Sequence, residues 1–144
     1  MRTETLVTDR GLRLRAEIPE TRWERARGLL GRDSLVPGAA LLLERARSIH
    51  TIGMRFDLGV AFLDTHLRVL HIARVPPGRV LVRRRGARHV LEMRTDVGLR
   101  TGDRVTRLGP GGRDPALGTA RRFRALYFRG CPRVGGAGSP APIV

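Results

Sequence analysis

The chain has 144 residues, a formal net charge of +15, one cysteine and an aromatic content of 4%. This length fits a single domain with or without a tail and leaves little room for a second core. One cysteine excludes a disulfide framework, and no apolar run approaches the roughly 20 residues that span a bilayer. With no apolar signal core at the start of the chain, these features predict a small cytoplasmic protein without a membrane span or disulfides.

The charge is carried by arginine alone: all 28 basic residues are arginine, against 13 acidic residues. Such an excess favours contact with polyanions such as RNA or DNA. A third function hypothesis is therefore a nonspecific nucleic-acid-associated protein that acts through Arg83, Arg84, Arg85 and the C-terminal tail. The chain has only six aromatic residues on which nucleic-acid bases could stack. Binding would therefore depend on salt and not on the nucleotide sequence. The plainer alternative is a solvated basic surface that reflects an arginine-rich composition.

One helix is predicted near the start of the chain. Residues 12–18 alternate apolar and polar side chains, which is typical of a half-buried strand. Thr21 and Glu24 then have the spacing of a capping box, so a helix is predicted over residues 21–31. Gly31 is expected to end this helix, and Gly28 is expected to lie inside it, where another backbone can approach closely.

The rest of the domain is predicted to be β. Short apolar or alternating runs indicate strands at residues 39–43, 60–63, 67–75, 80–82, 89–93 and 104–108. Many short strands with one early helix are typical of a mainly β fold, in the β-rich part of the α+β class. We therefore expect a small sandwich or a partly closed barrel with one flanking helix near residues 21–31.

The composition changes after residue 108. Gly, Pro and Arg dominate residues 109–144, so the sequence predicts an ordered domain over residues 1–108 and a disordered basic tail over 109–144. Residues 120–129 would form a short basic amphipathic helix, or else remain a mobile appendage. Cys131 lies in this tail without a rigid frame to lower its pKa, so a catalytic thiolate is not expected.

Three blocks of the sequence, in order, resemble the DUF192 (UPF0127) family. Residues 27–32 read RGLLGR, residues 50–64 contain HTIGMRF and VAFLD, and residues 87–105 contain ARHVLEM and GLRTGDRV. The resemblance covers roughly residues 12–108 and implies a compact β-rich domain with no established activity. Two positions depart from the family pattern: Gly59 stands where relatives carry aspartate, and Asp57 where they carry proline. A role that relatives assign to that aspartate would be lost here or moved by two residues.

The densest group of polar residues lies at the start of the second block, between Ser48 and Asp57. Our leading hypothesis is a non-catalytic binding or accessory module that recognises an anionic or polar ligand through residues 50–57. Arg55 is the expected anion contact, because its planar guanidinium binds a carboxylate or phosphate through two hydrogen bonds. The predicted ligand-binding residues are His50, Thr51, Arg55 and Glu92. The alternative is that His50 and Thr51 satisfy backbone groups of a loop.

An enzyme is the second hypothesis. His50 would act as a general base with Asp57 or Asp64, with or without help from a metal. No nucleophile motif, phosphate loop or cofactor motif accompanies these residues, so no cofactor and no metal site are predicted.

His89 and Glu92 have the spacing of two helical metal ligands but fall on a predicted strand. Residues three apart on a strand point to opposite faces, so Glu92 should share a face with Val90 and not with His89. Glu92 is expected to pair with an arginine such as Arg88 or one across the sheet. A metal held by His50, His89 and a carboxylate from different strands stays open as an alternative.

Overall fold

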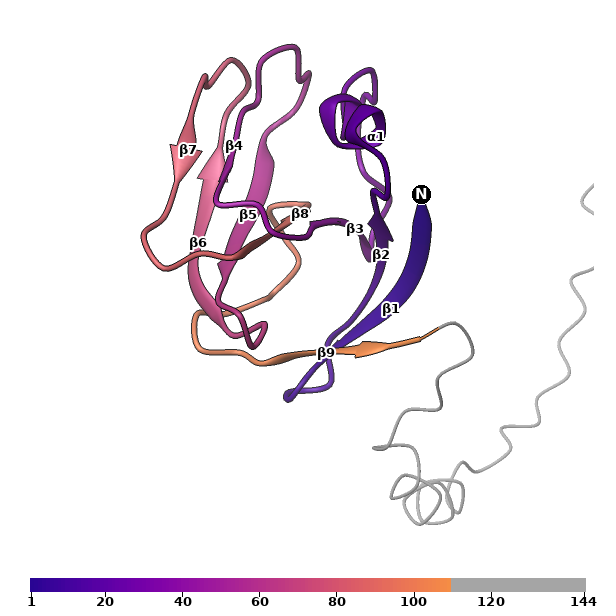
Figure 1. Ribbon diagram of the computed structural model, residues 1–144, viewed down its shortest axis with the longest axis vertical. Coiled ribbons are helices and arrows are strands. Elements are labelled where there is room, and N and C mark those ends of the chain that lie inside the picture. The colour runs from indigo at the N-terminus through magenta and orange to yellow at the C-terminus, as the bar shows by residue number, and fades with distance from the viewer. Residues whose placement is uncertain (110–144) are drawn as a thin grey trace, which may run out of the picture. The chain divides into compact units, whose positions relative to one another are not determined.

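Residues 1–109, the part of the chain that the computed structural model describes, form nine strands and one short helix (Figure 1). This composition of elements confirms the mainly β prediction. No helix in these residues is long and apolar enough to cross a membrane. In chain order the elements are β1 (Arg2–Thr8), β2 (Arg13–Ile18), α1 (Arg22–Arg27), β3 (Ala39–Leu43), β4 (Ser48–Ile49), β5 (Leu58–Leu63), β6 (Val69–Val75), β7 (Val82–Arg83), β8 (His89–Met93) and β9 (Val105–Leu108).

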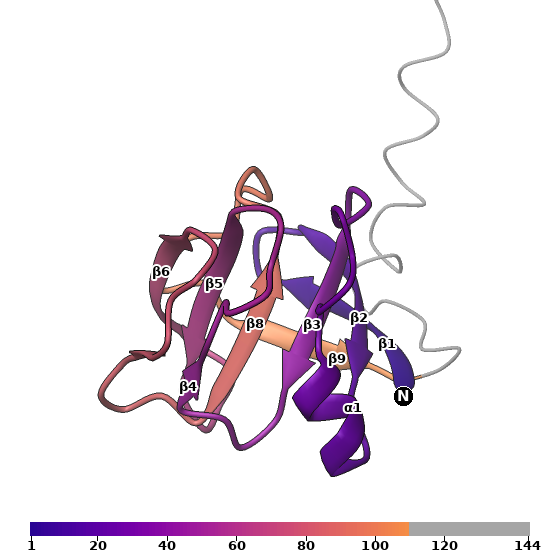
Figure 2. The ribbon, with the colours of Figure 1, turned by 90° about the horizontal axis from the view of Figure 1, so that it is seen from above.

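Seven strands form one curled sheet in the order β6-β5-β8-β3-β2-β1-β9 (Figure 2). β4 pairs with β7 in a separate two-stranded sheet (Figure 1). The pair β2–β3 is parallel and the others are antiparallel. The two edges of the large sheet approach each other where Arg68 and Arg104 form an isolated bridge. The Val105 amide also donates to the Leu67 carbonyl at 3.0 Å. The sheet is thus a partly closed barrel, as predicted.

Each face of the curled sheet carries its own apolar cluster. Successive side chains of a strand alternate between faces, so β8 sends Leu91 and Met93 into the cluster inside the curl and Val90 into a second cluster outside it. The second cluster also takes Leu29, which follows α1, and Ile49 of β4. Glu92 shares the strand face of Val90 and therefore points into the outer layer.

The helix is shorter than predicted. The capping box is present, with the Thr21 hydroxyl accepting from the Glu24 amide at 3.1 Å. The helix ends at Arg27, and Gly28 caps it with φ of 46°, a conformation that suits glycine. The expectation that Gly28 lies inside the helix and that Gly31 ends it is therefore wrong.

Three strand assignments also differ from the prediction, and one of them is β4, which was not expected. β1 was not predicted, because its sequence RTETLVT is rich in polar residues and it gains its hydrogen bonds from β2 and β9. The strand expected at residues 80–82 is reduced to β7, which pairs with β4 and not with the following β8. The predicted helix at residues 120–129 and Cys131 lie outside the described residues.

Candidate functional site

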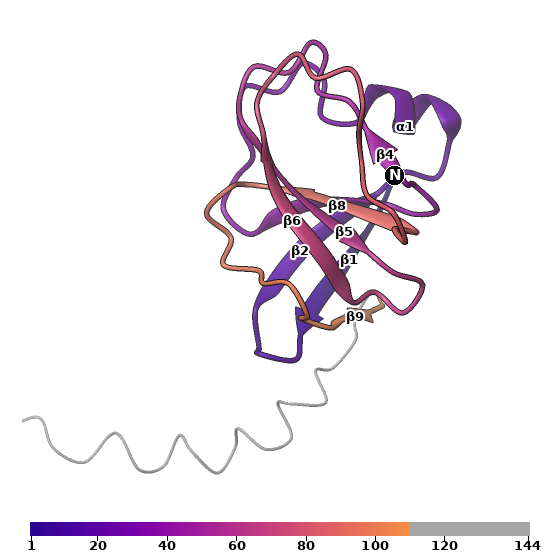
Figure 3. The same ribbon diagram turned by 90° about the vertical axis from the view of Figure 1, so that its left-hand side faces the viewer.

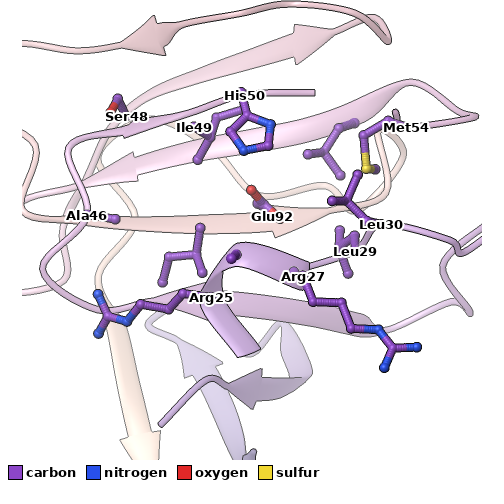
Figure 4. Close-up of a pocket in the computed structure, with 14 residues that line it drawn as sticks. Arg25, Arg27, Leu29, Leu30, Ala46, Ser48, Ile49, His50, Met54 and Glu92 are labelled. Carbon is purple, nitrogen blue, oxygen red and sulfur yellow. The ribbon is translucent and has the colours of Figure 1, made fainter. Parts of the chain in front are cut away.

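A pocket of about 220 Å³ opens between α1 and the segment that follows β3 (Figure 4). We call it the α1 pocket. Its lining combines apolar side chains with charged and polar ones from α1, β4, β8 and the residue that follows β4. The residues that line it are Arg25, Ala26, Arg27, Gly28, Leu29, Leu30, Leu43, Ala46, Ser48, Ile49, His50, Met54, Leu58 and Glu92.

Glu92 lies at the base of this pocket. It stands in β8 between Leu41 of β3 and Val60 of β5, which are its direct partners across the sheet. Its residue surface is 6% exposed, and within residues 1–109 it makes no ion pair or hydrogen bond. Burial disfavours the charged form and raises the pKa of the Glu92 carboxyl to about 7.

The expected pairing of Glu92 with an arginine is absent from the described residues. Register explains this: both cross-strand neighbours of Glu92 are aliphatic, and Arg88 is an exposed residue that precedes β8. A buried carboxylate without a partner normally carries a substantial free-energy cost. In Figure 4 its carboxylate is directed toward the side of the pocket where His50 lies.

His50 is exposed at the mouth of the α1 pocket, directly after β4. The structure therefore brings two of the four predicted ligand-binding residues, His50 and Glu92, into one pocket. The two aspartates proposed to assist His50 do not line it. Asp57 accepts from Nε and Nη2 of Arg74 at 2.7 and 2.6 Å. Asp64 caps the turn after β5 through backbone amides.

Thr51 has a structural role in this arrangement. It is fully buried, and its hydroxyl donates to the Pro76 carbonyl at 2.7 Å and accepts from the Arg79 amide at 3.0 Å. The Thr51 amide donates to the Arg79 carbonyl at 2.8 Å. These bonds hold the loop after β4 beside the loop after β6, and the two loops run together in Figure 3. The alternative interpretation of Thr51, as a residue that satisfies backbone groups, agrees with this geometry.

Replacing Thr51 with valine should therefore destabilise the protein by about 2 kcal/mol, because it leaves two backbone groups without their partner at a buried site. Thr51→Ser is the matched control, since it keeps the hydroxyl and removes only the methyl group. Urea unfolding measures the stability, and hydrogen exchange of the Arg79 amide reports the local bond. Equal exchange rates for that amide in the valine and serine variants would contradict this role.

Arg55, the predicted anion contact, points elsewhere. Its Nη1 donates to Asp33 Oδ1 at 2.6 Å in an exposed ion pair, and it does not line the α1 pocket. The rim instead carries Arg25 and Arg27 of α1, whose guanidinium groups extend outward on either side in Figure 4. Sequence reasoning missed these two arginines, although their place in the helix predicted over residues 21–31 was available as a signal.

A metal centre has no support in residues 1–109, where no group of three or more His, Cys, Asp or Glu side chains is arranged to hold an ion. His89, the other histidine considered as a ligand, is partly buried and accepts from the Arg45 amide through Nδ1 at 3.4 Å. Burial is the main cause that lowers the pKa of His89. His89 does not line the α1 pocket.

Comparisons with solved structures show the same fold in two bacterial proteins. A protein of unknown function from Novosphingobium aromaticivorans DSM 12444 is 24% identical with a TM-score of 0.62, over 72% of this chain and 83% of that one. A protein from Sinorhizobium meliloti 1021, provisionally described as a transcription regulator, is 21% identical with a TM-score of 0.63, over 76% and 95%. A comparison with curated proteins found no match.

The family model DUF192, described as "Uncharacterized ACR", matches residues 5–107. That range contains the whole α1 pocket, including His50 and Glu92. It also contains the three sequence blocks on which the resemblance was based. The chain belongs to the DUF192 family.

Proposed function

We propose that this domain binds a small polar ligand in the α1 pocket, with Glu92 as the group that recognises it. The observation that carries the proposal is a buried carboxylate, without a partner in residues 1–109, that faces a pocket open to solvent. A mostly apolar pocket with a few converging polar groups is the usual form of a small-molecule site. His50 and Met54 tie the pocket to the loop of residues 50–57, where the sequence placed the ligand.

The carboxylate defines the chemistry of the ligand. An ionised carboxylate only accepts hydrogen bonds, so the ligand should present a donor such as an amine, hydroxyl or amide. Arg25 and Arg27 at the rim leave room for an anionic group at the outer end of the same molecule. This changes the initial hypothesis, because the first contact is an acceptor in the pocket and not Arg55.

The size of the pocket limits the ligand to a small metabolite. A cavity of roughly 150 Å³ already accepts a molecule the size of benzene. The α1 pocket has about 220 Å³. An extended peptide or a dinucleotide would not fit inside it.

Ligand-observed NMR on the full-length protein tests this proposal with four small probes: ethanolamine, glycerol, acetamide and acetate. We expect saturation transfer to at least one of the three donor probes and a weaker effect on acetate. Glu92→Gln should weaken the transfer, because the amide keeps one acceptor oxygen but loses the charge and the second acceptor. Glu20→Gln, a matched change at an exposed surface position, should leave it unchanged.

The same experiment can overturn the proposal. If none of the donor probes gives saturation transfer, or if Glu92→Gln binds them as well as the wild type does, Glu92 does not recognise a ligand. Acetate binding that survives in Glu92→Gln would assign the pocket to anions held by the rim arginines instead.

Acid–base catalysis is a second candidate, favoured by one observation: two titratable groups, His50 and Glu92, line the same pocket. A carboxyl whose pKa lies at about 7 can both donate and accept a proton near neutral pH. Following the NMR samples over time tests this, because turnover would convert a bound probe into a new species. Binding without conversion would favour the non-catalytic module.

The predicted cytoplasmic location remains a proposal, which fractionation of cells expressing the full-length chain would test.

A further inference from the structure

A second hollow, which shares only Ser48 with the α1 pocket, has five arginines among its nine lining residues. It has a volume of about 510 Å³ and lies along the two-stranded sheet and the turn that leads from β7 to β8. We call it the arginine groove. Its charged residues are Arg47, Arg83, Arg84, Arg85 and Arg88, and its other lining residues are Ser48, Leu81, Gly86 and Ala87.

The pairing of β4 with β7 assembles this groove from two distant parts of the sequence. Ser48 lies opposite Arg83 in the antiparallel register. Arg47 precedes Ser48 and Arg84 follows Arg83, so the register brings these two arginines to the same end of the sheet. The Ala87 amide donates to the Arg84 carbonyl at 3.2 Å and closes the turn that carries Arg85.

The groove carries positive charge without compensation. No acidic residue lines it, and in residues 1–109 none of its five arginine side chains forms an ion pair or a hydrogen bond. Some arginines elsewhere are paired, as in Arg32–Glu17, Arg94–Asp96 and Arg107–Glu4. Other exposed arginines of residues 1–109, such as Arg15 and Arg22, form no ion pair there, but they do not share a hollow with other arginines. Five like charges around one hollow repel each other and attract an extended anion.

We propose that the arginine groove binds the phosphate backbone of a nucleic acid strand. Its five guanidinium groups are all exposed and spread along a hollow, which suits several phosphates in a row. A site for one small phosphate would instead need buried donors that converge on a point. No aromatic residue lines the groove, so bases have no stacking platform and binding is independent of sequence.

A charge-matched pair of triple variants of the full-length protein tests this proposal. One variant carries Arg84→Gln, Arg85→Gln and Arg88→Gln in the groove. The control carries Arg15→Gln, Arg22→Gln and Arg104→Gln, which are exposed positions outside the groove. Fluorescence anisotropy then measures binding of a labelled single-stranded oligonucleotide of mixed sequence between about 50 and about 200 mM salt.

The wild type should bind with a steep dependence on salt. Removing three phosphate contacts should make the slope of log K against log salt shallower by about 2, and should weaken binding at low salt on the order of a hundredfold. The control variant has the same net charge and should lose much less in both quantities. Oligonucleotides of different sequence should bind within a few-fold of one another.

Other outcomes overturn the assignment. Equal losses in the two variants would show that net charge alone drives the binding. An unchanged slope in the groove variant would place the contact on other arginines of the chain. Tripolyphosphate that displaces the oligonucleotide at equal phosphate concentration would indicate a small-anion site. Groove-dependent binding to phosphatidylserine vesicles without oligonucleotide binding would indicate a membrane surface.

Discussion

Replacing Glu92 with glutamine is expected to stabilise the protein by about 3 kcal/mol above pH 7 and to change its stability little at pH 5. The expected gain follows from burial, which raises the pKa of Glu92 from 4.5 to about 7. A shift of this size corresponds to roughly 1.4 kcal/mol per pH unit. Glutamine has nearly the same shape and never ionises, so it removes the cost of the buried charge.

The sign follows from proton binding. Between pH 4.5 and 7 the folded protein holds the Glu92 proton more tightly than the unfolded chain does. Stability therefore falls as pH rises through this window, and the loss is complete above the folded pKa. The lowered pKa of His89 acts in the opposite direction, because folding then favours its neutral form. The comparison of wild type with Glu92→Gln cancels the contribution of His89.

Urea unfolding of the wild type and Glu92→Gln at pH 5, 6, 7 and 8 measures this difference. Glu20→Gln, an exposed position, is the control and should show a flat difference across the series. A constant difference between wild type and Glu92→Gln from pH 5 to 8 would contradict a raised pKa. It would point instead to water or an ion that stabilises the carboxylate in the pocket.

Such a result would also bear on function. If the Glu92 carboxylate destabilises the folded state at neutral pH, an apolar residue at this position would stabilise the fold better. Residues of this kind are typical of binding and catalytic sites, where an ionisable group that lowers the stability of the fold is needed for binding or catalysis. If a donor probe binds at Glu92, it should offset part of the cost of the charge, and the raised pKa should fall when the probe is present.

The sequence predicted those parts of the fold that local patterns control. The alternation of residues 12–18, the capping box of Thr21 and Glu24, and the apolar run of β3 each fix a local geometry, and the structure has all three. β1 and the pairing of β7 with β4 depend on partners far along the chain. Register between distant strands leaves little trace in either sequence, so these features could not be predicted.

The candidate site shows the same division. Alternation along β8 correctly placed Glu92 on the face of Val90 and away from His89. The absence of an arginine partner depends on Leu41 and Val60 lying on either side of Glu92, which only the sheet order reveals. Because His50 and Asp57 are close in the sequence, they were expected to act together. In the structure, however, Asp57 forms an ion pair with Arg74 of β6.

Gly59→Ala is expected to destabilise the protein by about 3 kcal/mol, the upper end of the usual cost of overpacking. Gly59 lies in β5 between β6 and β8, opposite Arg74 and Met93. A Cβ atom at this position would lie 2.6 Å from the Arg94 carbonyl oxygen, which belongs to the backbone, so the contact cannot be relieved by a side-chain rotation. Either β8 shifts or the β5–β8 hydrogen bonds weaken.

Gly109→Ala is the matched control, because a Cβ there meets no atom within 4 Å. Urea unfolding should show little change for Gly109→Ala and a lower midpoint for Gly59→Ala, and equal midpoints would contradict the close approach. Gly59→Asp should be worse still, since its carboxyl adds volume at the same point. Position 59 therefore offers no room for a carboxylate in this chain, and Glu92 is the buried carboxyl that faces the α1 pocket.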